Sequence, residues 1–269
     1  MKRFSWVLTS LLVGIILTVP PVAGADGQSS GEESSTPARY FSELPLTILH
    51  DLAALPSDAS SPGGRPLLGL GAAFIISGPL YLDEAFRDMA RPMKGGVRPC
   101  VVPAELRDYL VDPFTLDDID LAIGLHAGSL AVLGTGWVTG NHRVANWGAA
   151  LLETVLLVDV TVLPTKVVTG RKRPGRGDGA LDFSPIGSVN DAFPSGHAAW
   201  TVGIACLVSR SPAPRWVKTL LWITGTAVSV QRILSDAHWT SDVIIGGMLG
   251  IWVGRRVAER HWPPATGTP

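Results

Sequence analysis

Six long apolar stretches dominate the chain from residue 67 onward, and they restrict its fold more than any other feature of the sequence. They cover roughly residues 67–82, 121–140, 144–165, 197–209, 216–234 and 242–254. None alternates strictly between apolar and polar residues, as a half-buried strand does, and most are longer than an ordinary strand. The sequence therefore predicts an all-α fold, a helical bundle of about six helices.

The composition of these stretches favours a bundle that is at least partly membrane-associated. Charged residues make up only 17% of the chain, and the mean hydropathy is +0.28, which is typical of a membrane protein or of an unusually apolar helical one. A membrane span needs about 20 predominantly apolar residues. Several stretches are shorter or contain charges such as Glu153 and Asp159, so a soluble bundle remains the alternative.

The N-terminal segment predicts export. Residues 1–25 combine a basic start, an apolar centre and a small-residue exit, the pattern of a signal peptide. We expect cleavage after Ala25, with an uncleaved anchor as the alternative. Residues 26–66 are interpreted as a Ser-, Gly- and Pro-rich linker with one amphipathic segment, 67–255 as the helical-bundle domain, and 256–269 as a polar C-terminal tail.

Charge and cysteine content exclude several classes of function. The formal net charge of −1 provides no basic field of the kind that marks nucleic-acid-binding proteins, so no nucleic-acid partner is expected. The chain has two cysteines, Cys100 and Cys206, and no C-x-x-C pair, which argues against the usual zinc and thioredoxin-like sites. Export permits a disulfide, but Cys206 lies in an apolar run where a reduced thiol is common, so no pairing is predicted.

Polar residues gather at the ends of three apolar stretches. Their ammonium and guanidinium groups suit phosphate oxygens, and backbone N–H groups at a helix start bind oxyanions. If the three ends converge, these residues form a cradle for a tetrahedral oxyanion. The residues are Lys166 and Arg173, then Ser195, Gly196 and His197, and then Arg232, His238 and Asp242.

His238 and Asp242 add acid–base chemistry to this cradle. Their i, i+4 spacing places both on one face of a helix, where the carboxylate fixes the imidazole tautomer and raises its basicity. His197 then lies opposite as a proton donor. No metal or other cofactor is expected, because the cationic side chains stabilise charge as an ion would. A metal site formed by His197, His238, Asp191 and Asp242 is disfavoured, since the neighbouring cations would repel an ion.

In this order, the patterns K-x6-R-P, P-S-G-H and R-x5-H-x3-D resemble the three signature motifs of the type 2 phosphatidic acid phosphatase superfamily. That superfamily also holds bacterial non-specific acid phosphatases and vanadium haloperoxidases, and the resemblance covers about residues 144–255. The family usually has Ser before the third-motif arginine, whereas this chain has Gln231. This difference puts one auxiliary phosphate contact in doubt.

The resemblance implies a role for each matched residue. His238 attacks phosphorus to give a phosphohistidine, Asp242 orients His238, and His197 protonates the leaving oxygen and then activates water. Arg171, Lys172 and Arg176 lie within or beside the first motif, and we interpret them as solvating the loop, with contact to an anionic head group as the alternative. The phosphate-binding residues are Lys166, Arg173, Ser195, Gly196 and Arg232.

The resulting hypothesis is a metal-independent phosphatase that acts on phosphomonoester or pyrophosphate groups, of lipids in the first place. One alternative is a soluble periplasmic non-specific acid phosphatase on small phosphoesters, and another is a vanadate-dependent haloperoxidase. The non-enzyme alternative is a membrane binding protein with an inactive site.

A count of membrane crossings supports an exported site. If residues 121–140 and 144–165 both cross and 67–82 lies in the interface, an even number of crossings precedes Lys166. The loops then left in the cytoplasm carry Arg or Lys, as expected there. We therefore expect localisation to the cell membrane or the periplasm, with the active site facing the periplasm.

Overall fold

The computed structural model describes residues 36–61, 71–72, 78–90, 118–176, 179–186 and 192–263. Within these ranges the regular elements are helices, and the only β contact is an isolated antiparallel bridge between Arg171 and Phe183. The predicted all-α fold is confirmed. Residues 1–35, which include the predicted signal peptide, and Cys100 lie outside the described ranges.

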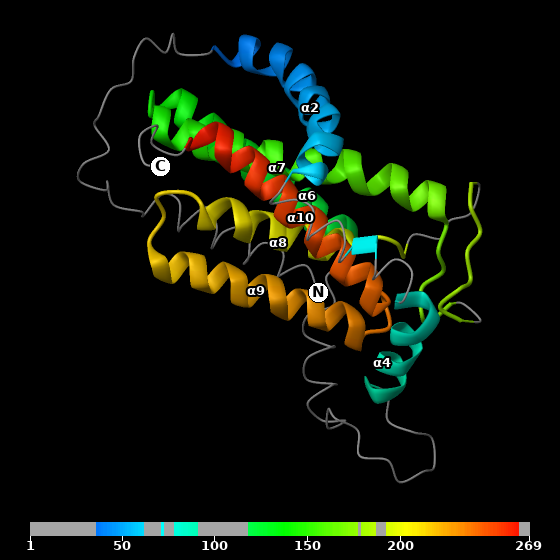
Figure 1. The fold of residues 1–269 in the computed structure, drawn as a ribbon. Coiled ribbons are helices and arrows are strands. Elements are labelled where there is room, and N and C mark those ends of the chain that lie inside the picture. Colours follow the sequence, from blue (N-terminus) through cyan, green and yellow to red (C-terminus); the bar gives the residue numbers. More distant parts are fainter. Residues whose placement is uncertain are drawn as a thin grey trace.

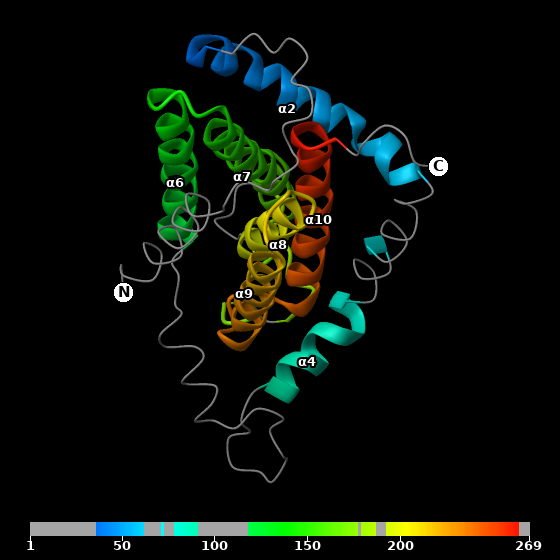
Figure 2. The same cartoon turned by 90° about the vertical axis from the view of Figure 1, so that its left-hand side faces the viewer.

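In the described part of the chain, five helices form a bundle, and two further regions pack at its ends (Figures 1 and 2). α2 (Pro37–Ser60) crosses one end, and η1 (Gly78–Leu82) with α4 (Asp83–Ala90) lies at the other. Of the predicted stretch 67–82, residues 78–82 form the π-helical turn η1, and most of the remainder lies outside the described residues. The bundle helices are α6 (Asp118–Val138), α7 (His142–Thr169), α8 (Gly196–Ser209), α9 (Arg215–Leu234) and α10 (Thr240–His261).

Local sequence signals set the ends of the helices that carry the predicted site. The Asn141 side chain accepts a hydrogen bond from the Val144 N–H at 3.2 Å and so caps the start of α7. Gly170 ends the same helix with a left-handed φ of 55°, and a Cβ there would lie 2.0 Å from the Ser184 carbonyl oxygen. Glycine at this position therefore lets the chain leave α7 tightly.

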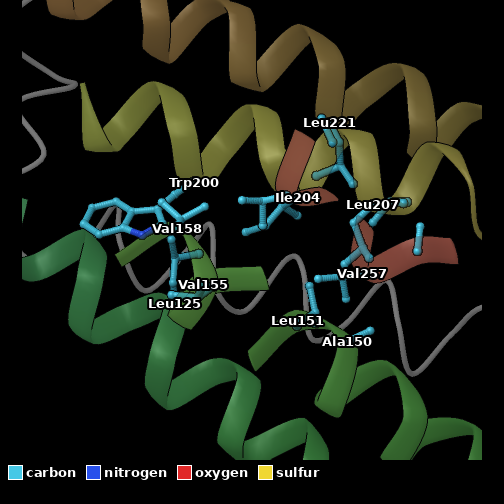
Figure 3. Close-up of a cluster of buried hydrophobic side chains, with 14 of the residues drawn as sticks. Leu125, Ala150, Leu151, Val155, Val158, Trp200, Ile204, Leu207, Leu221 and Val257 are labelled. Atoms are coloured by element: carbon cyan, nitrogen blue, oxygen red, sulfur yellow. The ribbon is translucent and has the colours of Figure 1, made fainter. Parts of the chain in front are cut away.

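A single large apolar cluster fixes the helices relative to one another (Figure 3). Burial of such side chains contributes about 1.5–3 kcal/mol each, so the cluster is the main source of the bundle's stability. It draws on all five bundle helices. Its members include Leu125, Leu151, Val155, Val158, Ile204, Leu207, Leu221 and Val257.

A row of glycines brings the backbones of α8 and α10 into contact. Gly246, Gly250 and Gly254 are spaced four residues apart on α10, and a Cβ at any of them would lie 2.2–2.4 Å from a carbonyl oxygen of the α8 segment. Small residues at this spacing allow helices to approach closely. As a result, the Ser195 N–H reaches the Asp242 carbonyl oxygen at 2.9 Å, which joins the second and third motifs.

α2 is attached to the bundle by a buried ionic cluster. The Arg260 guanidinium donates to both carboxylate oxygens of Asp51, at 2.9 and 2.7 Å, and to Oε2 of Glu153 at 2.7 Å. His261 Nε2 lies 3.0 Å from the same Glu153 oxygen. Both carboxylates are almost fully buried, so they depend on these partners for charge compensation.

Arg260→Leu is expected to lower the free energy of unfolding by about 3 kcal/mol, because it leaves two buried carboxylates short of a cation. Thermal denaturation measures the loss, and limited proteolysis reports whether α2 has detached. Arg255→Leu is the matched control, since Arg255 lies exposed on the same helix in an i, i+4 pair with Glu259. That control is expected to cost under about 0.5 kcal/mol, and equal losses in the two variants would contradict the prediction.

Among the described residues, one helix is long and apolar enough to cross a membrane by length and composition, namely α6 over Leu121–Val138. Several helices also expose large apolar side chains. These include Leu130 on α6, Leu163 and Val168 on α7, and Trp216 and Ile223 on α9. Cys206 is buried with a free thiol.

Candidate active site

The three predicted motifs lie at one end of the bundle, where four helix ends meet (Figure 1). Lys166 is in the last turn of α7, and Arg173 follows it in the connecting loop. Arg232 is in the last turn of α9. The second motif begins α8, and the third ends at the start of α10. The convergence that the sequence spacing suggested is therefore present in the fold.

The second motif forms the buried start of α8. Ser195 is the N-cap residue, and its hydroxyl accepts a hydrogen bond from the Ala198 N–H at 3.5 Å. Gly196 and His197 are the first two residues of the helix, and both are buried. The first N–H groups of a helix have no acceptor within it and favour an anion. The motif thus acts as a helix cap while also presenting donors at this end of the bundle.

A backbone carbonyl fixes the imidazole of His238. Its Nδ1 lies 2.7 Å from the Ala192 carbonyl oxygen, and because a carbonyl oxygen only accepts, Nδ1 carries the proton. In the neutral ring, Nε2 then holds the lone pair. Nε2 is buried and has no hydrogen-bond partner among the described residues. The ring is held in the tautomer that a nucleophile requires.

Asp242 acts to raise the basicity of His238, as predicted, but it does not set the tautomer of the ring. His238 precedes α10, so the two side chains do not share a helix face. Asp242 Oδ2 lies 3.7 Å from His238 Nδ1 and accepts the Trp239 N–H at 2.9 Å. The carboxylate therefore holds the turn that carries His238 and places a negative charge beside the ring, while Ala192 sets the tautomer.

Burial lowers the pKa of His238 below its usual value, because the charged imidazolium loses its solvation. The positive charges of Lys166 and Arg173 lower this pKa further, and the Asp242 carboxylate acts in the opposite direction. The two cations of the first motif thus lie close enough to His238 to interact with it electrostatically. The imidazole is neutral at pH 7 as a consequence.

Gln231 occupies the position where the family usually has Ser, and it contacts the third-motif arginine. Arg232 Nε donates to Gln231 Oε1 at 2.6 Å, and both side chains are buried. The Gln231 amide nitrogen has no hydrogen-bond partner among the described residues. Glutamine therefore supplies an acceptor that orients the Arg232 guanidinium.

The position of Arg171 contradicts one interpretation made from the sequence. It was expected to solvate the loop, but it is only 1% exposed and donates to Asp242 Oδ1 at 2.6 Å and to Asp83 Oδ2 at 2.7 Å. No motif pointed to Asp83, which lies far from the three motifs in the chain.

The glycine spacing on α10 was the one signal in the sequence that would have predicted how closely α8 and α10 approach.

In the part of the chain that the structure describes, no three His, Cys, Asp or Glu side chains gather as metal ligands. Asp191, which was considered for such a site, lies outside the described residues.

Comparison with known proteins identifies the same segment. A family model described as the PAP2 superfamily matches residues 147–263. A lipid A 1-phosphatase of Porphyromonas gingivalis is 28% identical over 144 residues, which cover 52% of this chain and 29% of that protein. An undecaprenyl-diphosphatase of Sulfolobus acidocaldarius is 36% identical over 62 residues, 23% of this chain and 30% of that protein.

A lipid A 1-phosphatase of Rhizobium johnstonii is 32% identical over 113 residues, which cover 39% of this chain and 44% of that protein. The alignments thus span less than half the length of each of these relatives. No solved structure matches the chain significantly. The matched segment contains every residue of the three motifs and the four helix ends that carry them, and over residues 147–263 this chain is similar to the PAP2 superfamily.

Proposed function

We propose that the chain is a metal-independent phosphatase that hydrolyses phosphomonoester or pyrophosphate groups of lipids through a phosphohistidine on His238. The observation that carries this proposal is the state of that ring. Its Nδ1 is tied to the Ala192 carbonyl, and its Nε2 is unpartnered among the described residues, while the charges of Lys166 and Arg173 act on it. The names of the relatives, which are lipid A 1-phosphatase and undecaprenyl-diphosphatase, support the reaction class.

In the first step, the Nε2 lone pair of His238 attacks phosphorus, and the bond from phosphorus to the leaving oxygen breaks. His197 donates its proton to that oxygen. The imidazole becomes positively charged as the N–P bond forms, and the Asp242 carboxylate 3.7 Å from Nδ1 stabilises this charge. The phosphoryl oxygens are held by Lys166, Arg173, Arg232 and the N–H groups at the start of α8.

In the second step, water attacks phosphorus from the side that the leaving group has vacated. His197, now neutral, accepts a proton from the water, and the N–P bond breaks. The products are inorganic phosphate and neutral His238, whose Nδ1–H still donates a hydrogen bond to the Ala192 carbonyl oxygen. The proton that His197 gave in the first step is restored, so both residues return to their starting state.

Exposed apolar side chains beside Lys166 support a lipid substrate. Leu163, Val167 and Val168 occupy the last turns of α7 around Lys166 and are 57–61% exposed. Exposed apolar groups this close to a phosphate site suit a ligand whose phosphate is attached to a hydrocarbon body. A small, fully polar phosphoester gains nothing from them.

The same exposed surfaces lead us to propose that the protein is membrane-associated, with its active site facing the periplasm. α6 has the length and composition of a membrane span, and α7 and α9 also expose large apolar residues. Fractionation of expressing cells tests this, because a membrane-associated chain stays with the membranes after a high-salt, detergent-free wash. Recovery in the soluble fraction would favour the soluble acid phosphatase.

The activity is tested with the full chain purified in detergent and a chelator present. Phosphate release is measured from phosphatidate, from an isoprenyl pyrophosphate and from a small soluble phosphomonoester. We expect turnover of at least one lipid substrate, with a higher kcat/KM than for the soluble ester. Turnover of the soluble ester alone would contradict the proposal of a lipid substrate. If no substrate is turned over, the proposal of phosphatase activity is wrong.

The lowered pKa of His238 predicts the pH dependence of kcat/KM. Protonation removes the Nε2 lone pair, so activity falls as pH drops through this pKa, which lies below the ordinary histidine value of about 6.5. Lys166→Met removes a positive charge that lowers the pKa of His238. The acidic limb of the profile of kcat/KM against pH is therefore expected to move to higher pH, and kcat/KM itself is expected to fall. Lys172→Met is the control, since Lys172 Nζ pairs with Asp182 at 2.8 Å, and its limb is expected to stay in place.

A further inference from the structure

Asp83, the first residue of α4, caps the start of α10 from outside that helix. Its Oδ1 accepts the Ser241 N–H at 2.7 Å, and its Oδ2 accepts the Ser241 hydroxyl at 2.6 Å. The residue before α10 is Trp239, whose indole has no oxygen and cannot accept a capping hydrogen bond. A carboxylate from α4 therefore supplies the cap that the local sequence lacks.

Arg171 connects this cap to the carboxylate beside His238. It donates to Asp83 Oδ2 at 2.7 Å, to Asp242 Oδ1 at 2.6 Å and to the Ser241 hydroxyl at 2.8 Å. The side chains of Arg171, Asp83 and Asp242 are all fully buried. Two buried carboxylates this close to each other require a shared cation, so the position of each depends on the other two groups.

α4 also contacts the loop of the first motif. Glu84 Oε1 accepts the Ala180 N–H at 3.1 Å, and the Arg87 guanidinium donates to the Pro174 carbonyl oxygen. Arg87 further lies over the Trp239 ring, 5.2 Å from its centroid. One short helix thus bonds to the loop that carries Arg173 and to the turn that carries His238.

We propose that Asp83 is a positioning residue for His238, acting through Arg171 and Asp242. Asp242 Oδ2 accepts the Trp239 N–H, the amide next to His238 in the chain, so a shift of Asp242 moves the imidazole relative to phosphorus. Asp83 bonds to Ser241 and Arg171 rather than to the His238 ring. It lies outside residues 147–263, which match the family. The inference rests on the proposed function, because that function makes His238 the nucleophile.

The kinetic test uses the full chain carrying Asp83→Asn, which keeps the shape but removes the charge. We expect kcat to fall about 10-fold or more, because small displacements of a reacting group are costly, while KM stays within about twofold. Arg171→Met is expected to lower kcat as well. Because both residues act through one network, the double variant is expected to have a kcat only slightly below that of the more impaired single variant. Asp88→Asn, exposed on the same helix, is the control and is expected to keep the wild-type kcat.

A second measurement does not depend on turnover. In ¹⁵N-histidine-labelled protein, the Nδ1–H of His238 is expected to give a slowly exchanging signal, assigned by its absence in His238→Gln. In Asp83→Asn this proton is expected to exchange faster with solvent, although circular dichroism and the melting curve still show a folded bundle. If folded Asp83→Asn keeps the wild-type exchange rate and kcat, the positioning role is wrong. If the wild-type chain releases no phosphate, the proposed function is wrong, and the exchange rate still decides whether Asp83 positions the ring.

Discussion

His238→Gln is expected to lower kcat for phosphate release by at least about 1,000-fold, because the amide has no lone pair able to form the N–P bond. Glutamine is close to histidine in size, so the fold is expected to remain intact. Single-turnover labelling gives the direct measurement. With ³²P-labelled substrate and an alkaline quench, wild-type protein is expected to retain label on histidine, and the variant none.

His142→Gln is the matched control for this experiment. His142 starts α7 at the end of the bundle away from the site and is exposed, so its loss is expected to leave kcat and labelling unchanged. Full turnover by His238→Gln would reject the phosphohistidine mechanism. Label retained on His238→Gln would place the covalent intermediate on another residue.

Gly246→Ala is expected to have the next largest effect, although it adds only one methyl group. The new Cβ would lie 2.3 Å from the Ser195 carbonyl oxygen, so α8 and α10 must move apart at the point where the second and third motifs meet. Overpacking of this kind costs about 1–3 kcal/mol of stability. A displacement of about 1 Å between reacting groups lowers kcat by about 100-fold. Melting curves and phosphate release measure the two losses.

The neighbouring glycine offers a control on the same helix. A Cβ at Gly247 would meet only the Val202 side chain, at an ordinary 3.9 Å. Alanine is the better helix former by about 1 kcal/mol, so Gly247→Ala is expected to raise the melting temperature and to keep the wild-type kcat. Equal effects of the two substitutions would show that helix propensity matters at both positions and backbone contact at neither.

The apolar stretches predicted the bundle helices well, because burial and helical length both appear in local composition. The end of α10 was harder to predict. The apolar stretch was placed at 242–254, whereas the helix continues to His261. Its polar last turns contact α2 and α7 through Arg260, which pairs with Asp51 and Glu153. Such pairs join residues far apart in the chain, and no local pattern reveals them.

In the candidate site as well, the sequence predicted some features and left others unpredicted. The three motifs bring their polar residues to one end of the bundle because each lies at a helix end, and the sequence was sufficient to predict that. The role of the Ala192 carbonyl, which bonds His238 Nδ1, depends on how a loop passes the ring. Arg171 looked like an ordinary loop cation because its partner Asp83 precedes it by 88 residues and belongs to no motif.

The positions of α2 and α4 have a consequence for membrane sidedness. Asp51 of α2 pairs with Arg260 near the end of α10, and Asp83 of α4 bonds to Ser241 near its start. The 22 residues of α10 extend about 33 Å, close to the hydrocarbon thickness of a bilayer of about 30 Å. In a bundle whose α10 crosses the membrane, Asp51 of α2 and the active site therefore lie toward opposite faces of the membrane.

If the bundle spans the bilayer, the chain must cross the membrane an odd number of times between α2 and Lys166. Two crossings, with residues 67–82 in the interface, were expected from the sequence, and that number does not fit a spanning bundle. Export of α2 together with a periplasmic site is compatible only with a bundle that does not span. In a spanning bundle, a membrane-impermeant reagent added on one side labels α2 only if α2 lies on that side. The active site, and with it the phosphate of the substrate, then lies on the other side. The helix farthest from the chemistry thus reports the side of the membrane on which the chemistry takes place.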